Sequence, residues 1–208
     1  MLKRFAILGL GLLVSACVSS DDLDLPPADL GNFNLVHNIV VAPRVATASS
    51  ISREVSEEEL TSSLQSAIAD RFDRYDGEKD YHFGVSIEGY VLARAGIPVV
   101  AAPKSAMIIR LTVWDDAAGA KLNVPPEQIT VLENIDGESL LGTGWTQTAE
   151  TQLAGLSKNA AKAIETFLIE QNAEQGWFMS DAVVAEEGVT IDPDSLRDDV
   201  ANRTPVAD

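Results

Sequence analysis

Cys17 is the only cysteine of the 208 residues, so its thiol has no partner for an internal disulfide. It follows the apolar run Phe5–Val14, which begins after the cations Lys3–Arg4 and ends at the small residues Ser15–Ala16. A positive start, a short apolar segment and small residues together form an export signal that is cleaved. The apolar run is well short of the roughly 20 residues that cross a bilayer. The chemistry that this pattern indicates is processing of the chain directly before a thiol.

The four residues Val14-Ser15-Ala16-Cys17 resemble the lipobox of bacterial (diderm) lipoproteins. The resemblance implies that diacylglycerol alkylates the Cys17 thiol, and that cleavage after Ala16 leaves Cys17 as the first residue of the mature protein. It also implies further acylation in many of these bacteria, and two or more acyl chains hold a protein stably on a membrane. Cleavage without lipid would instead leave a free reactive thiol, which an exported protein does not need. The lone cysteine therefore favours lipidation.

The residue after Cys17 is Val18, and this position bears on the membrane to which a lipoprotein is delivered. In the best-known sorting rule of the family, an Asp at this position retains the protein in the inner membrane. The resemblance therefore implies a lipid anchor in the outer membrane, with the domain facing the periplasm. The inner membrane stays open as an alternative, because the rule differs between bacterial groups.

Acidic residues dominate the composition. The full chain has 32 acidic and 15 basic side chains and a formal charge of −17; without the signal it has 13 basic side chains and a charge of −19. Phosphate backbones repel such a surface, so we expect no nucleic-acid partner. Anionic lipid surfaces repel it as well, which suits a domain that a tether holds away from the bilayer.

No catalytic or metal-binding pattern is present in the mature sequence, which lacks a G-x-S-x-G elbow, an H-E-x-x-H pair, a P-loop and a cysteine pair. The spacing of the two histidines, His37 and His82, suggests neither a nucleophile nor a metal site, and structural or solvated roles explain them. Asp115 and Asp116 lack the further oxygen ligands that calcium needs, and a hairpin turn explains them. We therefore expect no enzyme, no cofactor and no metal.

Composition divides the chain into four parts. Residues 1–16 are the signal peptide, and residues 17–34 are the lipidated cysteine followed by a polar, proline-bearing flexible tether. Residues 35–172 carry nearly all of the periodic pattern and form an α+β globular domain. Residues 173–208 form an acidic tail, largely disordered.

Two helices and a first strand are predicted within the globular part. The apolar run Leu35–Ala42 predicts a buried strand. Ser56 and Glu59 form a capping box at the start of a helix that has one apolar face and ends at Gly77. The closing helix is expected at Thr146–Asn172, with apolar residues along one side.

Further strands are predicted where apolar and polar residues alternate, around residues 82–91, 107–114, 121–124 and 128–133. Residues 115–119 have the composition of a hairpin turn. The element order is strand, helix, several strands, helix. It predicts a two-layer α+β fold with a mostly antiparallel sheet of about four to six strands and two long helices packed on one face.

This layout resembles the small sheet-and-helix domains of periplasmic lipoproteins, which include auxiliary subunits of envelope transport systems and many uncharacterised proteins. The resemblance rests on the lipobox and on the order of the elements. It implies a binding or assembly role rather than catalysis.

The first candidate for a partner surface is the connection Ala95–Ala102, which is apolar for a link between strands and contains Ile97, Val99 and Val100. Connections normally lie at the surface, so an apolar one can contact a partner, a lipid or a ligand. The alternative is that it covers an open end of the core.

The second candidate is the mixed face of the predicted strands, with Glu88, Tyr90, Arg110 and Trp114. Tyr, Trp and Arg dominate the energetics of protein contacts, so an uncovered face of this kind can bind a peptide, a glycan or another protein. The acidic tail or a neighbouring subunit can cover it instead.

These features predict a lipid-anchored, non-enzymatic accessory or assembly factor that binds another envelope protein. The alternative is a carrier or sensor of a small or lipidic ligand, which requires an apolar cavity lined partly by Ile97, Val99 and Val100.

Overall fold

The computed structural model describes residues 22–47, 52–93, 105–133 and 148–179. The helices and strands in these ranges are, in chain order, β1 (Phe33–Val41), β2 (Ala46–Thr47), α1 (Glu57–Phe72), β3 (Lys79–Val91), β4 (Ala106–Asp115), β5 (Ala120–Lys121), β6 (Glu127–Leu132) and α2 (Ala149–Gln175). Neither helix in these ranges combines the length and the hydropathy of a membrane-spanning segment.

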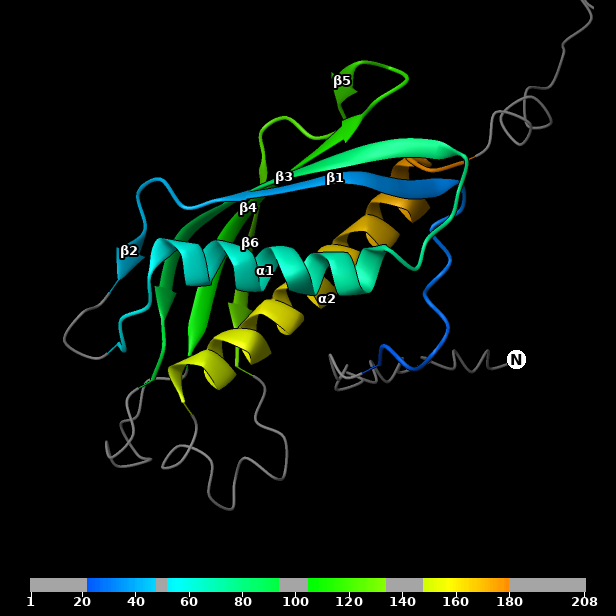
Figure 1. Cartoon of the computed structure of the whole chain (residues 1–208). Coiled ribbons are helices and arrows are strands. Elements are labelled where there is room, and N and C mark those ends of the chain that lie inside the picture. Colours follow the sequence, from blue (N-terminus) through cyan, green and yellow to red (C-terminus); the bar gives the residue numbers. More distant parts are fainter. Residues whose placement is uncertain (1–21, 48–51, 94–104, 134–147, 180–208) are drawn as a thin grey trace, which may run out of the picture.

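The strands form one mixed sheet with β3 and β4 at its centre (Figure 1). β4 pairs antiparallel with β3 on one side and with β6 on the other. β1 pairs with the opposite edge of β3 and runs parallel to it, because the chain crosses over through α1 between these two strands. The short strands β2 and β5 pair with the ends of β3 and β4.

Both helices lie on the same face of the sheet (Figure 1). The apolar face of α1 contributes Leu64, Ile68 and Phe72, and all three side chains are fully buried. α2 contributes Ile164 and Leu168, which are equally buried. Since each such side chain contributes about 1.5–3 kcal/mol on burial, the core between sheet and helices is the main source of stability.

The start of α1 confirms the predicted capping box. The Ser56 hydroxyl accepts a hydrogen bond from the Glu59 backbone N–H (3.1 Å), and the Glu59 carboxylate accepts one from the Ser56 N–H (2.7 Å). Two donors at the helix N-terminus are thereby satisfied. The helix ends at Phe72, five residues before Gly77, where the sequence analysis placed its end.

The end of α2 lies beyond its predicted end. The helix continues past Asn172 to Gln175 and ends at Gly176, whose φ of 67° is the left-handed conformation that glycine adopts readily. Phe178 follows and is fully buried, with its ring 5.0 Å from that of Phe33. Residues 173–179, which the composition placed in the acidic tail, are therefore part of the domain.

The observed fold confirms the α+β class, the order of the main elements and the packing of two helices on one sheet face. The sheet differs from a purely antiparallel one because β1 and β3 are parallel. A strand-helix-strand crossover within one sheet produces this parallel pair.

The N-terminal segment, which we define as residues 22–32, lies against the domain, although its polar composition predicted a flexible tether that reached residue 34. Leu30 is 1% exposed, and the Asn32 N–H donates to the Phe178 carbonyl at 2.8 Å. Arg74 donates to two backbone carbonyls of the segment, those of Leu23 (3.0 Å) and Leu25 (2.9 Å). One apolar side chain and several hydrogen bonds therefore hold a segment that its composition alone marks as mobile.

Candidate functional site

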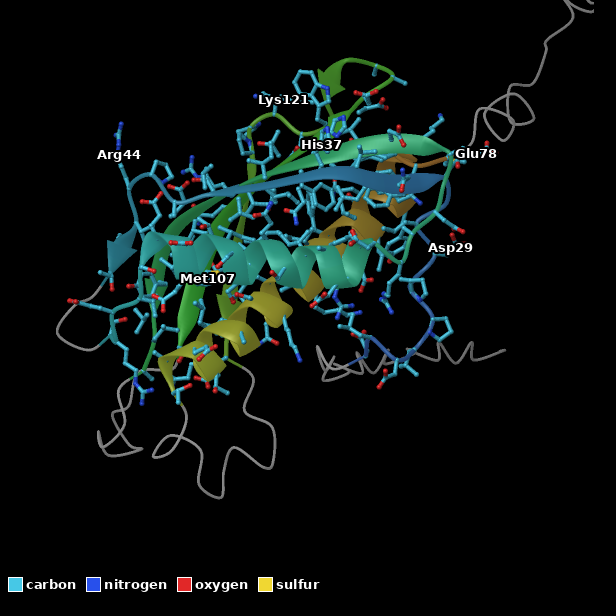
Figure 2. The ribbon with its side chains drawn as sticks, viewed as in Figure 1. Asp29, His37, Arg44, Glu78, Met107 and Lys121 are labelled. Carbon is cyan, nitrogen blue, oxygen red and sulfur yellow. The ribbon has the colours of Figure 1, made fainter. Side chains whose placement is uncertain are left out.

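One face of the sheet is covered by neither helix, and we call it the open face. Its side chains come from β1, β3 and β4. Along each strand they alternate with residues that face the helices, most of which are buried. Its central residues are His37, Ile39, Val41, His82, Arg110 and Trp114. Figure 2 shows His37 and Lys121 on this side, away from the helices.

Apolar side chains are exposed on the open face. Ile39 is 60% exposed, Val41 46% and Trp114 37%. Single exposed apolar residues are ordinary, but these belong to strands that lie side by side in one sheet. The open face therefore offers a surface that gains free energy when another molecule covers it.

The parallel pairing of β1 and β3 places His37 directly beside His82. The two rings are stacked, with centroids 4.9 Å apart and planes inclined by 22°. His82 Nε2 lies 3.0 Å from Asp116 Oδ1, and Trp114 is the neighbour of His82 in the β3–β4 register. The sequence predicted no contact between the two histidines, because they are 45 positions apart and only the crossover places their strands side by side.

The chemistry of this histidine pair is limited by what surrounds it. A carboxylate bonded to an imidazole can orient it as a general base, but a nucleophile must lie within hydrogen-bond reach. No hydroxyl group in the described ranges is hydrogen-bonded to His82, and these ranges bring no three potential metal ligands together. The two stacked rings form part of the surface of the open face.

Arg110 and Trp114 lie where the sequence analysis placed them, as exposed residues of β4 on the face away from the helices. Tyr90 does not. The pairing of β3 with β4 has an irregularity between Ile87 and Gly89, and this bulge reverses the alternation, so that Tyr90 turns toward the core and pairs with the buried Met107. Tyr90 is 7% exposed, and its hydroxyl accepts a hydrogen bond from the Val55 N–H at 3.3 Å.

The other candidate residues of the sequence analysis lie outside the described ranges. These are Cys17, the expected lipidation site, and Ile97, Val99 and Val100 of the apolar connection. The acidic tail from residue 180 onward lies outside them too.

A group of ionisable side chains that the sequence did not predict lies together at the two helices. We call it the ionic cluster, and it consists of Asp22, Arg71, Arg74, Tyr75, Lys162 and Glu165. Arg71 and Glu165 are 2% and 1% exposed, and Arg71 Nη1 donates to Glu165 Oε2 at 2.9 Å. The Tyr75 hydroxyl donates to the other Glu165 oxygen at 2.8 Å.

Asp22 of the N-terminal segment completes the ionic cluster. Its Oδ1 accepts from Arg71 Nη2 at 2.6 Å, and its Oδ2 accepts from Lys162 Nζ at 2.7 Å. Lys162 also donates to Glu165 at 2.7 Å. Each carboxylate therefore accepts hydrogen bonds from two cations, and Asp22 supplies one of the two negative charges that face Arg71, Arg74 and Lys162.

The pKa values of the ionic cluster reflect this mutual pairing. Burial raises the pKa of Asp22, but hydrogen bonds from Arg71 and Lys162 outweigh it and bring the pKa down to about 2. Burial likewise raises the pKa of Glu165, and its bonds to Lys162 and Tyr75 and the charge of Arg71 lower it overall. Burial and the bond to Glu165 raise the pKa of Tyr75. These shifts favour the charged forms of Asp22 and Glu165 and the neutral form of Tyr75 at neutral pH.

Comparisons by sequence identify no relative: no protein-family model matches the chain, and no curated protein matches it significantly. Comparisons by structure find solved chains at low identity. A protein of Xanthomonas campestris assigned to the family model DUF330 aligns with a TM-score of 0.40 and 13% identity, over 68% of this chain and 88% of its own.

Two further solved structures align over similar lengths. A chain described as “a putative lipoprotein from Caulobacter crescentus CB15” has a TM-score of 0.31 and 13% identity, over 70% of this chain and 93% of its own. The PelC dodecamer from Paraburkholderia phytofirmans has a TM-score of 0.35 and 12% identity, over 67% of this chain and 91% of its own. These values assign neither a family nor a role to the chain.

Proposed function

We propose that this protein is a lipoprotein, anchored in the outer membrane through acylated Cys17, that acts without catalysis as an accessory or assembly factor in the periplasm. It binds another envelope protein through its open face. The observation that carries the proposal is the open face itself, where Ile39, Val41 and Trp114 are exposed beside Arg110 and the stacked histidines.

The composition of the open face suits a protein partner. Interfaces combine an apolar centre with polar groups at the rim, and Trp and Arg are among the residues that contribute most to binding energy. Ile39 and Val41 supply apolar area from β1, while Trp114 and Arg110 lie on β4 two strands away. His82 lies on β3 between these two strands, next to Trp114 on one side and His37 of β1 on the other. The partner must offer apolar area together with acceptors for Arg110.

Site-specific photo-crosslinking in living cells tests the binding role. A photo-reactive residue replaces Ile39 or Trp114 on the open face, and matched controls replace Ser66 of α1 or Ala154 of α2, which are exposed on the helices. We expect a discrete crosslinked envelope protein from the two open-face positions only. Equal crosslinking from all four positions, or none from the open face, contradicts the proposed surface.

A charge-reversal pair tests the specificity of that contact. Arg110→Glu places an anion among the apolar residues of the open face and is expected to abolish the crosslink from Ile39. Arg44→Glu makes the same change at an exposed position beyond the end of β1, at the edge of the molecule in Figure 2, and should leave the crosslink intact. If the detergent-extracted protein carries only lipid or a small molecule and no protein, a carrier role replaces the proposed one.

Mass spectrometry of the mature N-terminal peptide tests the anchor. The expected peptide begins at Cys17 and carries the added mass of diacylglycerol and a further acyl chain. Cys17→Ala should release the protein from the membrane fraction. An unmodified Cys17, or an intact Met1, contradicts the anchor.

A further inference from the structure

We infer that the lipid anchor holds the helix layer next to the phospholipid surface and turns the open face away from it. This inference rests on the proposed acylation of Cys17, and it adds an orientation that the anchor alone does not imply. Its basis is the place where the N-terminal segment is attached to the domain.

The attachment begins at Asp22, whose carboxylate binds Arg71 of α1 and Lys162 of α2 at 2.6 and 2.7 Å. The next residues are held through their backbone, because Arg74 donates to the carbonyls of Leu23 and Leu25. Farther along, Leu30 is buried. The segment is therefore held at Asp22–Leu25 and again from Leu30 to the start of β1.

The position of Asp22 limits how far Cys17 can lie from the domain. Five Cα–Cα steps separate Cys17 from Asp22, and a fully extended chain covers at most about 18 Å in five steps. A free tether that reached residue 34 would extend to roughly 55–60 Å. The held segment therefore reduces the reach of the anchor about threefold and keeps its attachment point near the lipid headgroups.

The attachment point lies on the side of the molecule opposite to the open face. Asp22 contacts the two helices, which cover one sheet face, while the open face is the other one. Figure 1 shows the N-terminal segment on the helix side, with the sheet beyond the helices. Packed layers are about 10 Å apart, so the helices keep their contact with Asp22 about one layer spacing away from the sheet, on the side opposite to the open face.

The surface near the attachment point supplies one apolar contact for the bilayer. Leu25 is 64% exposed and is followed by Pro26 and Pro27. Its position three residues after Asp22 places it within the short reach of the anchor. The expected neighbour is a zwitterionic phospholipid surface, because the charge of −19 that remains after signal removal opposes close approach to anionic lipids.

Fluorescence quenching on vesicles measures this orientation. The acylated full-length protein carries a single added cysteine, Leu25→Cys or Ile39→Cys, which is the one free thiol once Cys17 is acylated. The two positions are similarly exposed, at 64% and 60%, so a fluorophore on either leaves the core undisturbed. The vesicles are phosphatidylcholine with a nitroxide-labelled headgroup lipid. We expect severalfold stronger quenching of the Leu25 label than of the Ile39 label.

An insertion that lengthens the chain between Cys17 and Asp22 provides the decisive variant, because it leaves the described domain unchanged. A Gly-Ser stretch of roughly 20 residues after Ser20 adds a root-mean-square reach of about 25 Å. It should remove most of the difference between the two labels. The same insertion between Ala117 and Ala118, in the exposed turn after β4, is the matched control and should preserve the difference.

The outcomes separate the two proposals. If the acylated protein binds vesicles and both labels are quenched equally, or if the insertion after Ser20 changes nothing, the inferred orientation is overturned while the anchor stands. If the purified protein has no acyl chain and does not bind vesicles, the proposed anchor itself is overturned, and the orientation with it.

Discussion

Among single residues, Arg71 and Glu165 carry charges that are almost completely withdrawn from solvent. Removing two ions from water costs several kcal/mol for each ion, and only close pairing with further hydrogen bonds offsets this cost. Glu165 has such bonds from Arg71, Lys162 and Tyr75. The ionic cluster is therefore sensitive to the loss of any one partner, which makes its energetic role measurable.

Glu165→Ala is predicted to destabilise the domain by about 3 kcal/mol or more, because it removes the buried carboxylate that pairs with the buried Arg71. Glu170→Ala makes the same substitution five residues later on an exposed part of α2, and it should change the free energy of unfolding by less than about 0.5 kcal/mol. Urea unfolding of both variants measures the two values. Equal effects would show that the ionic cluster contributes nothing beyond helix propensity.

Asp22→Asn is predicted to weaken the pH dependence of the free energy of unfolding in the acidic range. The folded-state pKa of Asp22 is about 2, below the ordinary value of 3.8, so the charged form stabilises the fold above that value. Because Asp22 is 22% exposed and solvent weakens its ion pairs, this contribution is about 2 kcal/mol at neutral pH. It disappears as the pH falls from 3.8 toward 2. Unfolding curves over this range should show wild type and variant converge. A constant difference at all pH values would contradict the prediction.

The sequence contains a signal for part of the ionic cluster and none for the rest. Arg71 falls seven residues after Leu64, within the apolar face of α1, and Glu165 follows the buried Ile164. A charged residue at such a position indicates a buried pair. Asp22 gives no comparable signal, because it lies 49 positions before Arg71 in a polar stretch that is typical of a tether. Only the folded chain shows that it balances the charge of Arg71.

Among the elements, the close contact between β1 and the turn before β3 determines how the parallel pair begins. The Gly77 N–H donates to the Phe33 carbonyl at 3.0 Å, and a Cβ atom on Gly77 would lie 2.3 Å from the Phe33 nitrogen. Its nearest neighbours are backbone atoms, which cannot move aside as a flexible side chain does. The close approach of the two backbone segments therefore requires glycine at this position.

Gly77→Ala is predicted to destabilise the protein by about 3 kcal/mol or more, through overpacking against the backbone of β1. Gly155→Ala is the matched control, because nothing lies within 4 Å of its added Cβ on α2. Alanine in a helix interior is favoured over glycine, so this control should gain about 0.5–1 kcal/mol. Thermal unfolding of both variants should give midpoints that shift in opposite directions.

The pattern of apolar residues predicted the elements well where local rules decide. The capping box of α1 and the alternation in β4 follow from neighbouring residues, and both are observed. Tyr90 was misplaced because a bulge adds one residue to β3 without altering the sequence pattern around it. The stacking of His37 on His82 was equally inaccessible, since the register of two strands joined through a helix is set by packing of the whole layer.

At the scale of the whole molecule, the N-terminal segment belongs to the folded domain. Leu30 is buried, and Asp22 binds cations of both helices. The composition of this region predicted mobility, because one buried leucine and one paired aspartate are not distinguishable in a stretch of polar residues and prolines. The domain boundary is therefore a property of tertiary contacts, and it can be located by truncation.

A variant that begins at Phe33 is predicted to be less stable than one that begins at Asp22 by about 3 kcal/mol or more. Loss of the buried Leu30 side chain alone removes about 1.5–3 kcal/mol, and the loss of Asp22 leaves Arg71 and Lys162 with one carboxylate between them. Both variants are produced without the lipid anchor and compared by urea unfolding, with a variant that begins at Val18 as the reference. Equal stability of the variants from Val18 and from Asp22 would place the boundary of the folded domain at Asp22. If the variant from Phe33 matched them, the segment would be a tether after all, and the orientation inferred for the anchored protein would lose its basis.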